Sequence, residues 1–114
     1  MTKTYDILTY VSELGNGPNL ILSHLEKDPA LVDAYAEFSL SEHKYAWRAA
    51  WVIHHFSSKH PRQIQKYADK YIAILPKLEL DGHIREIINT LINLELTEEQ
   101  ESELFDICYG FIQS

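Results

Sequence analysis

Apolar residues recur along this chain at intervals of three and four positions, which is the spacing of one face of an α-helix. The segment that starts at Pro61 shows the pattern most clearly, with one stripe formed by Ile64, Tyr67, Ala68, Tyr71, Ile72 and Leu75. Its other positions are mostly charged or amide side chains, which predicts a solvated face. No run of residues alternates convincingly between apolar and polar, so the pattern predicts an all-α protein without a sheet.

Proline, glycine and capping residues divide this pattern into about seven helices. Asp28 followed by Pro29 predicts an N-cap with a proline in the first turn of the next helix. Thr97 and Gln100 have the spacing of a capping box at the start of the last helix. We expect a single domain over residues 1–114, divided into antiparallel helix pairs at about 4–27, 28–59 and 60–94 and a terminal helix at 97–113.

A weak internal repeat supports this division. Arg48 and Arg85 lie 37 residues apart, each in the second helix of a pair, and each has an acidic residue six positions earlier, Glu42 and Glu79. A period in the thirties with two helices per unit is typical of α-solenoids. The expected fold class is therefore a short stack of helix pairs.

The fourth expected helix, from about residue 42 to residue 58, carries the strongest candidate for a binding surface. One narrow arc of its helical projection contains Lys44, Arg48, Trp51, His55 and Lys59. Because most of these side chains are polar or charged, we expect the arc to face solvent. Tryptophan beside arginine is typical of the hot spots of protein–protein interfaces.

Two further expectations concern the same helix. The alternative to an exposed Trp51 is that it packs under a neighbouring helix while Arg48 bridges neighbouring repeats. Trp47 is expected in the core, since aromatic residues at helical spacing are usually buried.

The last helix carries two apolar stripes. Leu104, Ile107, Cys108 and Phe111 form the first, and Phe105, Tyr109 and Ile112 form the second. The first stripe can pack on the preceding helix, and the second also needs cover. We expect Phe105, Tyr109 and Ile112 to form a contact between copies of the chain, and the alternative is that they nestle between two helices of the same chain.

Charge and composition narrow the function. The chain has 17 acidic and 10 basic residues, a net charge of −7, which disfavours nucleic acid as a partner. There is no run of residues apolar and long enough for a signal peptide or a membrane span, and Cys108 is the single cysteine. These features predict a soluble cytoplasmic protein with no membrane contact.

Candidate chemistry is sparse. The six histidines include no pair at the i, i+4 spacing of a helix-borne metal site, so no metal is expected: His24, His43, His54, His55, His60 and His83. Cys108 lies among apolar residues, where cysteine behaves as a small hydrophobe. No serine elbow, phosphate loop or dinucleotide fingerprint is present. The sequence therefore predicts no catalytic residue and no cofactor.

Residues 47–53, Trp-Arg-Ala-Ala-Trp-Val-Ile, resemble a stretch of the small HEAT-like, armadillo-type helical repeat proteins common in Bacteroidetes-type bacteria. Further similar stretches lie at 60–61, 81–85 and 104–108, so the resemblance covers roughly residues 28–112. It implies a right-handed HEAT/ARM-like superhelix without assigned catalytic residues. Members of that group continue for one or more helices beyond the position of Ser114, so we expect this module to lack C-terminal helices.

The resemblance also implies a ladder between neighbouring units. In HEAT repeats generally, an acidic residue and an arginine form this ladder, and Glu42–Arg48 and Glu79–Arg85 match its spacing.

Three functions follow from these observations. The leading one is a non-enzymatic protein–protein interaction or scaffold module with a protein partner. The second is a DNA-alkylation-repair type of nucleic-acid enzyme, which the acidic charge disfavours. The third is a purely structural, self-associating piece of a longer repeat protein, favoured by the second apolar stripe of the last helix.

Overall fold

The computed structural model describes residues 18–113, with side chains from 21 to 111, and the regular secondary structure of this part of the chain is all helical. The elements are α2 (Pro18–Lys27), α3 (Pro29–Ser39), α4 (Ala46–Lys59), α5 (Pro61–Ile64), η2 (Gln65–Tyr67), α6 (Ala68–Ile74), η3 (Leu75–Lys77), α7 (Asp81–Ile92) and α8 (Glu98–Gln113). With α5 to η3 counted as one bent helix, residues 18–113 form six helices and no strand. The all-α prediction is confirmed, and the first helix of the pair expected at about 4–27 lies outside the described residues.

Two helices begin where their capping residues predicted. The Asp28 carboxylate accepts hydrogen bonds from the backbone N–H groups of Ala30 and Leu31, at 3.1 and 3.3 Å. Thr97 and Gln100 form a reciprocal capping box, because each side chain accepts from the backbone N–H of the other, at 3.1 and 2.9 Å. Each bond satisfies an N–H group that has no partner inside its own helix.

The start of α4 differs from the expected start near residue 42. The helix begins at Ala46, and residues before it form a turn. In this turn the Tyr45 N–H donates to Nδ1 of His43 at 3.1 Å, and the Ala46 N–H donates to the His43 carbonyl at 2.9 Å. These local bonds give the backbone an alternative to the first helical turn.

The fifth expected helix is bent. It contains 3₁₀ segments at Gln65–Tyr67 and Leu75–Lys77 between its α-helical parts. Pro76 has no backbone N–H and belongs to the second of these segments, where the helix ends. The apolar stripe nevertheless stays buried, since Ile64, Tyr71 and Leu75 are fully enclosed.

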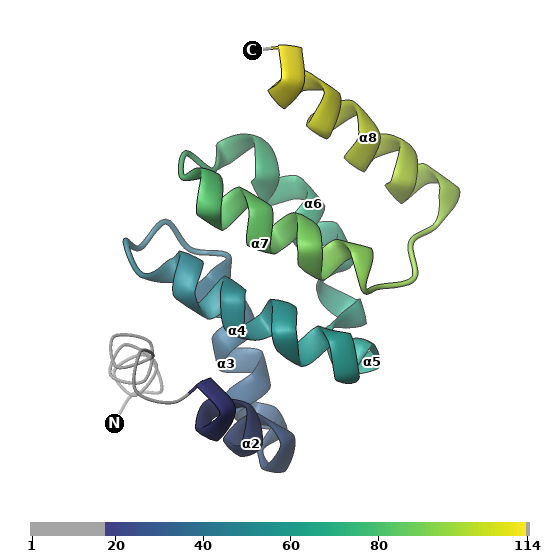
Figure 1. The fold of residues 1–114 in the computed structure, drawn as a ribbon. Coiled ribbons are helices and arrows are strands. Elements are labelled where there is room, and N and C mark those ends of the chain that lie inside the picture. The colour runs from purple at the N-terminus through teal and green to yellow at the C-terminus, as the bar shows by residue number, and fades with distance from the viewer. Residues whose placement is uncertain (1–17, 114) are drawn as a thin grey trace.

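The helices stack so that like elements of neighbouring units lie side by side. α3 turns back into α4 through a short loop, and the bent helix turns back into α7 (Figure 1). α4 packs most extensively along α7, while α6 also contacts α8. The continuous core between them includes Tyr35, Ile53, Phe56, Ile87 and Leu91.

Polar side chains also join neighbouring units. The His54 imidazole on α4 binds the Glu86 carboxylate on α7 at 2.7 Å. The Tyr67 hydroxyl donates to the Asp33 carboxylate on α3 at 2.8 Å, and the Lys66 ammonium lies 3.0 Å from the same carboxylate. These bonds fix the register of one helix pair on the next.

The arginine ladder implied by the resemblance is not found among the ion pairs of the described side chains. The ion pairs among the described side chains join other residues, and neither Glu42–Arg48 nor Glu79–Arg85 is among them. The physical reason is placement, because Glu42 and Glu79 lie in loops outside the helices and are exposed. Among the described residues, no helix is both long and apolar enough to cross a membrane.

Candidate functional site

The expected binding arc on α4 is only partly open to solvent. Lys44 is exposed in the turn before the helix, and Lys59 is exposed at its end. Arg48, Trp51 and His55 are half-buried between them. Trp51 packs against the hydrophobic core with part of its surface, so the structure lies between the two expectations for this residue.

A row of ring contacts connects this arc to α7. The Trp51 and His55 rings lie 4.3 Å apart between centroids, and the His55 and His54 rings stack at 4.6 Å. The His54 ring in turn donates from Nδ1 to the Glu86 carboxylate. Contacts of this kind restrict rotamers, so the row holds Trp51 in a fixed orientation.

The imidazole of His55 is disposed to remain neutral. Burial lowers the pKa of His55 below its ordinary value, and the neighbouring His54 lowers it further. The Glu86 carboxylate acts in the opposite direction without reversing the shift. A neutral ring next to Trp51 presents both a hydrogen-bond donor and an acceptor to a partner.

Trp47 contradicts its expected place in the core. Its side chain is 38% exposed. The Arg48 guanidinium carbon lies 5.4 Å from the centre of the Trp47 ring and 5.2 Å from that of Tyr45, which are cation–π distances. Trp47 is four positions before Trp51, so the two side chains share one face of α4. We call Trp47, Arg48, Trp51 and His55, with Lys44 and Lys59 at the ends, the α4 surface.

Sequence reasoning missed Trp47 because it relied on the general rule that aromatic residues at helical spacing are usually buried. His54 on the same helix turns toward Glu86 on α7, a contact that the helical projection also did not reveal.

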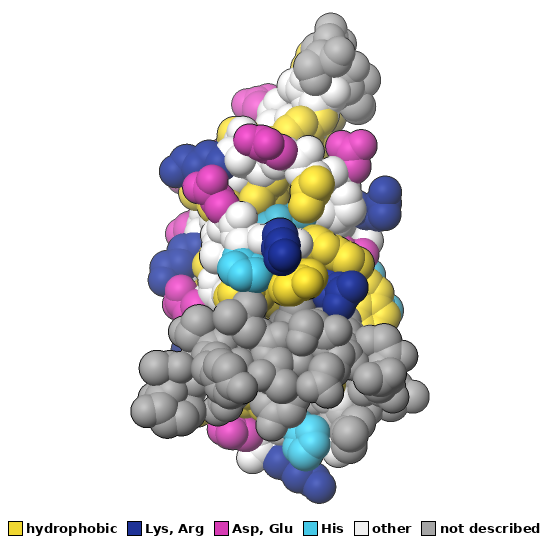
Figure 2. All heavy atoms as spheres, turned by 90° about the vertical axis from the view of Figure 1, so that its left-hand side faces the viewer, with side chains coloured by type: hydrophobic (Ala, Val, Ile, Leu, Met, Phe, Trp, Pro, Cys, Tyr) yellow, Lys and Arg dark blue, Asp and Glu magenta, His cyan; other side chains and the backbone are white. Residues whose placement is uncertain are grey.

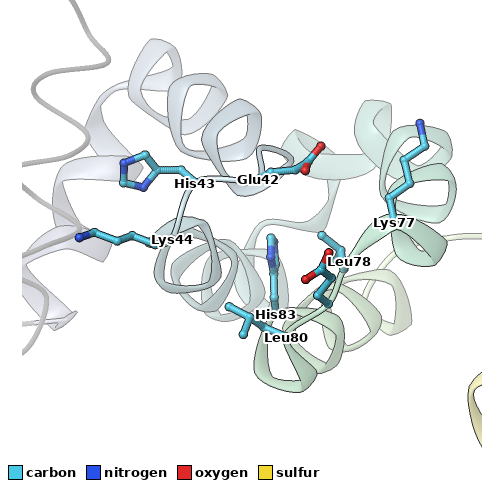
Figure 3. Close-up of a pocket in the computed structure, with 8 residues that line it drawn as sticks. Glu42, His43, Lys44, Lys77, Leu78, Leu80 and His83 are labelled. Atoms are coloured by element: carbon cyan, nitrogen blue, oxygen red, sulfur yellow. The ribbon is translucent and has the colours of Figure 1, made fainter.

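A pocket of about 180 Å³ lies at the edge of the stack, between the loop that precedes α4 and the loop that precedes α7 (Figure 3). Its lining combines both loops with the first turn of α7: Glu42, His43, Lys44, Lys77, Leu78, Glu79, Leu80 and His83. Figure 2 views this edge of the molecule and shows histidine and Lys or Arg side chains beside hydrophobic ones in its middle. Lys44 therefore belongs both to the α4 surface and to the pocket.

The floor of the pocket is a buried histidine. His83 is 4% exposed, and its Nε2–H donates to the Ser39 carbonyl at 2.7 Å. Burial lowers the pKa of His83, while the bond to the Ser39 carbonyl opposes this shift. Sequence reasoning counted His83 among possible metal ligands and found no spacing signal for this role.

The second apolar stripe of α8 is open. Phe105 is 67% exposed and Tyr109 is 53% exposed, and their rings stack with centroids 6.2 Å apart. The expectation that they nestle between helices of the same chain is therefore wrong for these two residues. The side chain of Ile112 lies outside the described residues. The expected contact between copies through Phe105, Tyr109 and Ile112 stays a prediction.

Other candidate chemistry is limited within the described residues. No group of three or more His, Cys, Asp or Glu side chains among them lies close enough to hold a metal ion. Cys108 is half-buried, and burial raises the pKa of its thiol, which keeps the sulfur protonated and weakly reactive.

Comparison with known proteins identifies one family. A model of the HEAT repeat domain family matches residues 18–114. No curated protein and no solved structure matches the chain significantly. The match specifies no group of organisms, so the bacterial group named by the resemblance stays a prediction.

Proposed function

Since the chain belongs to the HEAT repeat domain family, we propose that it is a non-enzymatic module that binds a protein partner through the α4 surface. Repeat units of this kind stack into an elongated core and leave a long continuous surface for partners. The partner in this proposal covers the two tryptophans and Arg48, with Lys44 and Lys59 at the rim.

The strongest support for this proposal is the accessibility and fixed orientation of the two tryptophans. Two tryptophans on one face of α4 remain accessible, and both are held in place by neighbours: Trp47 by the Arg48 guanidinium and Trp51 by the His55 ring. Pre-oriented aromatic side chains lose little conformational entropy on binding. Tryptophan and arginine are also the residue types most enriched among the residues that dominate interface energies.

The charge distribution favours a protein over a nucleic acid as the partner. The two lysines at the rim and Arg48 are cationic, but the whole chain has a net charge of −7. Nucleic-acid binding depends on many phosphate contacts, which an overall negative field opposes. An acidic or neutral protein segment can contact the cationic rim of the α4 surface, and this contact does not require the whole chain to carry a positive charge.

Affinity capture from nuclease-treated native lysate tests the proposal. The bait is the full chain, and the test variant is Trp47→Ala/Arg48→Ala, chosen because Trp47 is exposed and its loss leaves no buried cavity. A captured protein is then purified and titrated calorimetrically against both forms. We expect the variant to bind at least about tenfold more weakly, since each lost hot-spot side chain contributes about 2 kcal/mol.

Phe105→Ser/Tyr109→Ser is the matched control, because it removes two exposed aromatic side chains on a different helix. The proposal requires this control to bind the partner like the wild type. A partner lost by the α8 control and retained by the α4 variant would place the interface on α8 and contradict the proposal.

A further inference from the structure

The pocket between the two loops is lined by side chains that accept hydrogen bonds. Glu42 and Glu79, which the sequence placed 37 residues apart as ladder residues, both line this one pocket. Figure 3 shows the Glu42 side chain extending over the space between the loops. The two carboxylates therefore give the pocket a negative rim.

The third acceptor is the buried ring of His83. A carbonyl oxygen can only accept, so Nε2 must carry the proton in its 2.7 Å bond to the Ser39 carbonyl. In the neutral ring Nδ1 is then an acceptor, and among the described residues it has no hydrogen-bond partner. This acceptor belongs to a residue that is 4% exposed and lines the pocket, so a donor placed in the pocket can bond to it.

The two lysines of the pocket lining do not extend into the pocket. Lys44 and Lys77 also belong to the lining, but Figure 3 shows both side chains directed away from the space between the loops. Leu78 and Leu80 supply apolar walls on the α7 side, and Leu80 is 53% exposed. The pocket thus combines two carboxylates, one neutral acceptor and an apolar wall.

We propose that this pocket binds the guanidinium group of an arginine side chain presented by a protein partner. A guanidinium carries five N–H donors in one plane, which can serve two carboxylates and the imidazole acceptor together. The methylene groups of the arginine side chain pack against Leu78 and Leu80. This proposal does not depend on the α4 surface, because none of its three acceptors belongs to that surface.

Other occupants fit the pocket less well. A metal ion requires several ligands within about 2.5 Å of one point, and no such group exists among the described residues. An anion would be repelled by the negative charges of Glu42 and Glu79. An alkylammonium offers its three donors at a single point, whereas a guanidinium spreads five donors over a plane and is the better match for acceptors on two loops.

Solution NMR of the full chain, with N-acetyl-arginine amide as the probe, tests the proposal. We expect saturable shifts of backbone amides in residues 42–44 and 77–83, together with a change in the Nδ1 resonance of His83. N-acetyl-citrulline amide has nearly the same shape without the charge, and it should produce no saturable shift. Shifts equal for both probes, or shifts clustered elsewhere, would overturn the proposal.

Two charge-matched variants extend the test. Glu42→Gln/Glu79→Gln should weaken binding of the arginine probe by at least about tenfold, because both charge-assisted hydrogen bonds become neutral ones. Glu103→Gln/Asp106→Asn changes the net charge equally on exposed positions of α8 and should bind like the wild type. Equal weakening by both variants would show a general effect of charge and contradict the assignment to this pocket.

The source of the guanidinium is tested with two further probes. A protein-borne arginine predicts that a short blocked peptide with a central arginine binds at least as tightly as the blocked amino acid. Free arginine, with its charged α-amino and α-carboxyl groups, should bind more weakly than either. Tightest binding of free arginine would indicate a small-molecule site and would contradict a protein partner.

Discussion

Ser39 links α3, α6 and α7 through hydrogen bonds that are buried from water. Its hydroxyl donates to the Ala36 carbonyl at 2.6 Å, so the Tyr71 hydroxyl must donate to Ser39 in their 2.8 Å bond. The Ser39 carbonyl accepts from His83 on α7. Ser39 and Tyr71 are fully buried, and burial raises the pKa of Tyr71, which keeps its hydroxyl protonated as this arrangement requires.

Replacing Ser39 should therefore be costly. Ser39→Ala leaves the Tyr71 hydroxyl buried without an acceptor, so we expect the free energy of unfolding to fall by about 1–3 kcal/mol. Urea denaturation measures this change. Ser58→Ala is the control, because Ser58 makes the same kind of bond to a carbonyl three residues earlier, at 2.7 Å, on the exposed surface. Adding Tyr71→Phe to Ser39→Ala should recover part of the loss, and no recovery would contradict the role of the hydroxyl.

Two histidines give the stability a dependence on pH. The pKa values of His55 and His83 are lowered from 6.5 in the folded chain, chiefly by burial. The unfolded chain then binds more protons than the folded chain as the pH falls through 6.5, so stability is complete above that pH and declines below it. Urea denaturation at pH 7.5 and 5.5 should show the lower free energy of unfolding at pH 5.5. A His55→Asn variant should lose less over this interval, and greater stability of the wild type at pH 5.5 would contradict the prediction.

Residues that act on their immediate neighbours could be predicted from the sequence. Asp28 and Thr97 cap their helices as expected because an N-cap bond spans only two or three residues. Trp47 could not be placed this way, since its exposure depends on how the rest of the fold packs against α4. The same limit applies to His83, whose partner Ser39 lies 44 residues earlier.

At the scale of elements, α8 differs from the other helices. It packs on α6 through Leu104, Ile107 and Phe111, which are half-buried. The Gln100 amide also donates to the Asp69 carboxylate at 2.7 Å. By contrast, α4 and α7 contain fully buried residues along most of their length.

This difference predicts a local opening of α8. Hydrogen exchange of its backbone amides should be faster than that of α4 and α7, because few buried apolar contacts oppose its detachment. Thr97→Ala removes one half of the capping box and should lower the protection of α8 by about 1 kcal/mol, while α4 stays unchanged. Thr97→Ser keeps the hydroxyl and should behave like the wild type. Equal loss of protection across all helices would show that α8 opens only with the whole chain.

The elements themselves were largely predictable, and their ends and bends were less so. Helical spacing of apolar residues identified α3, α4, α7 and α8, because each helix buries one stripe. The turn before α4 depends on His43, whose ring competes for a backbone N–H in a way that spacing does not reveal. The 3₁₀ segments of the bent helix likewise left the apolar stripe of the sequence intact.

At the scale of the whole molecule, charge opposes association through the open face of α8. This helix begins with Glu98, Glu99 and Glu101 and has no lysine or arginine along its length. Two copies meeting through Phe105 and Tyr109 bring these acidic residues together.

Self-association through α8 should therefore strengthen as salt is added. Sedimentation equilibrium at about 0.05 M and 0.5 M NaCl should show more dimer at the higher concentration, where repulsion is screened. Phe105→Ser/Tyr109→Ser should remain monomeric in both conditions. A dimer that weakens with salt, or one that survives this double substitution, would contradict a contact through these aromatic residues.

The repeat was visible in the sequence, but its contacts were not. Arg48 and Arg85 suggested a period of 37 residues. Several side-chain contacts between neighbouring units instead join residues 31 to 34 positions apart, as in His54–Glu86, Tyr67–Asp33 and Gln100–Asp69. Side chains on facing helices point toward each other from different turns, so the spacing of contacts is shorter than that of equivalent positions. Acid–base pairs at this shorter spacing are the better signal.

The attachment of α8 through α6 also determines how the stack responds to a stretching force. A load applied between the two ends of the stack passes through each boundary between units in series, so the boundary with the fewest buried contacts yields first. Here that boundary lies between α6 and α8, whereas α4 and α7 are held along their length by a shared core and by the His54–Glu86 bond. Stretching single molecules should release α8 in a separate first step at low force. Under such a load the molecule would lengthen by the span of α8 before the rest of the stack unfolds.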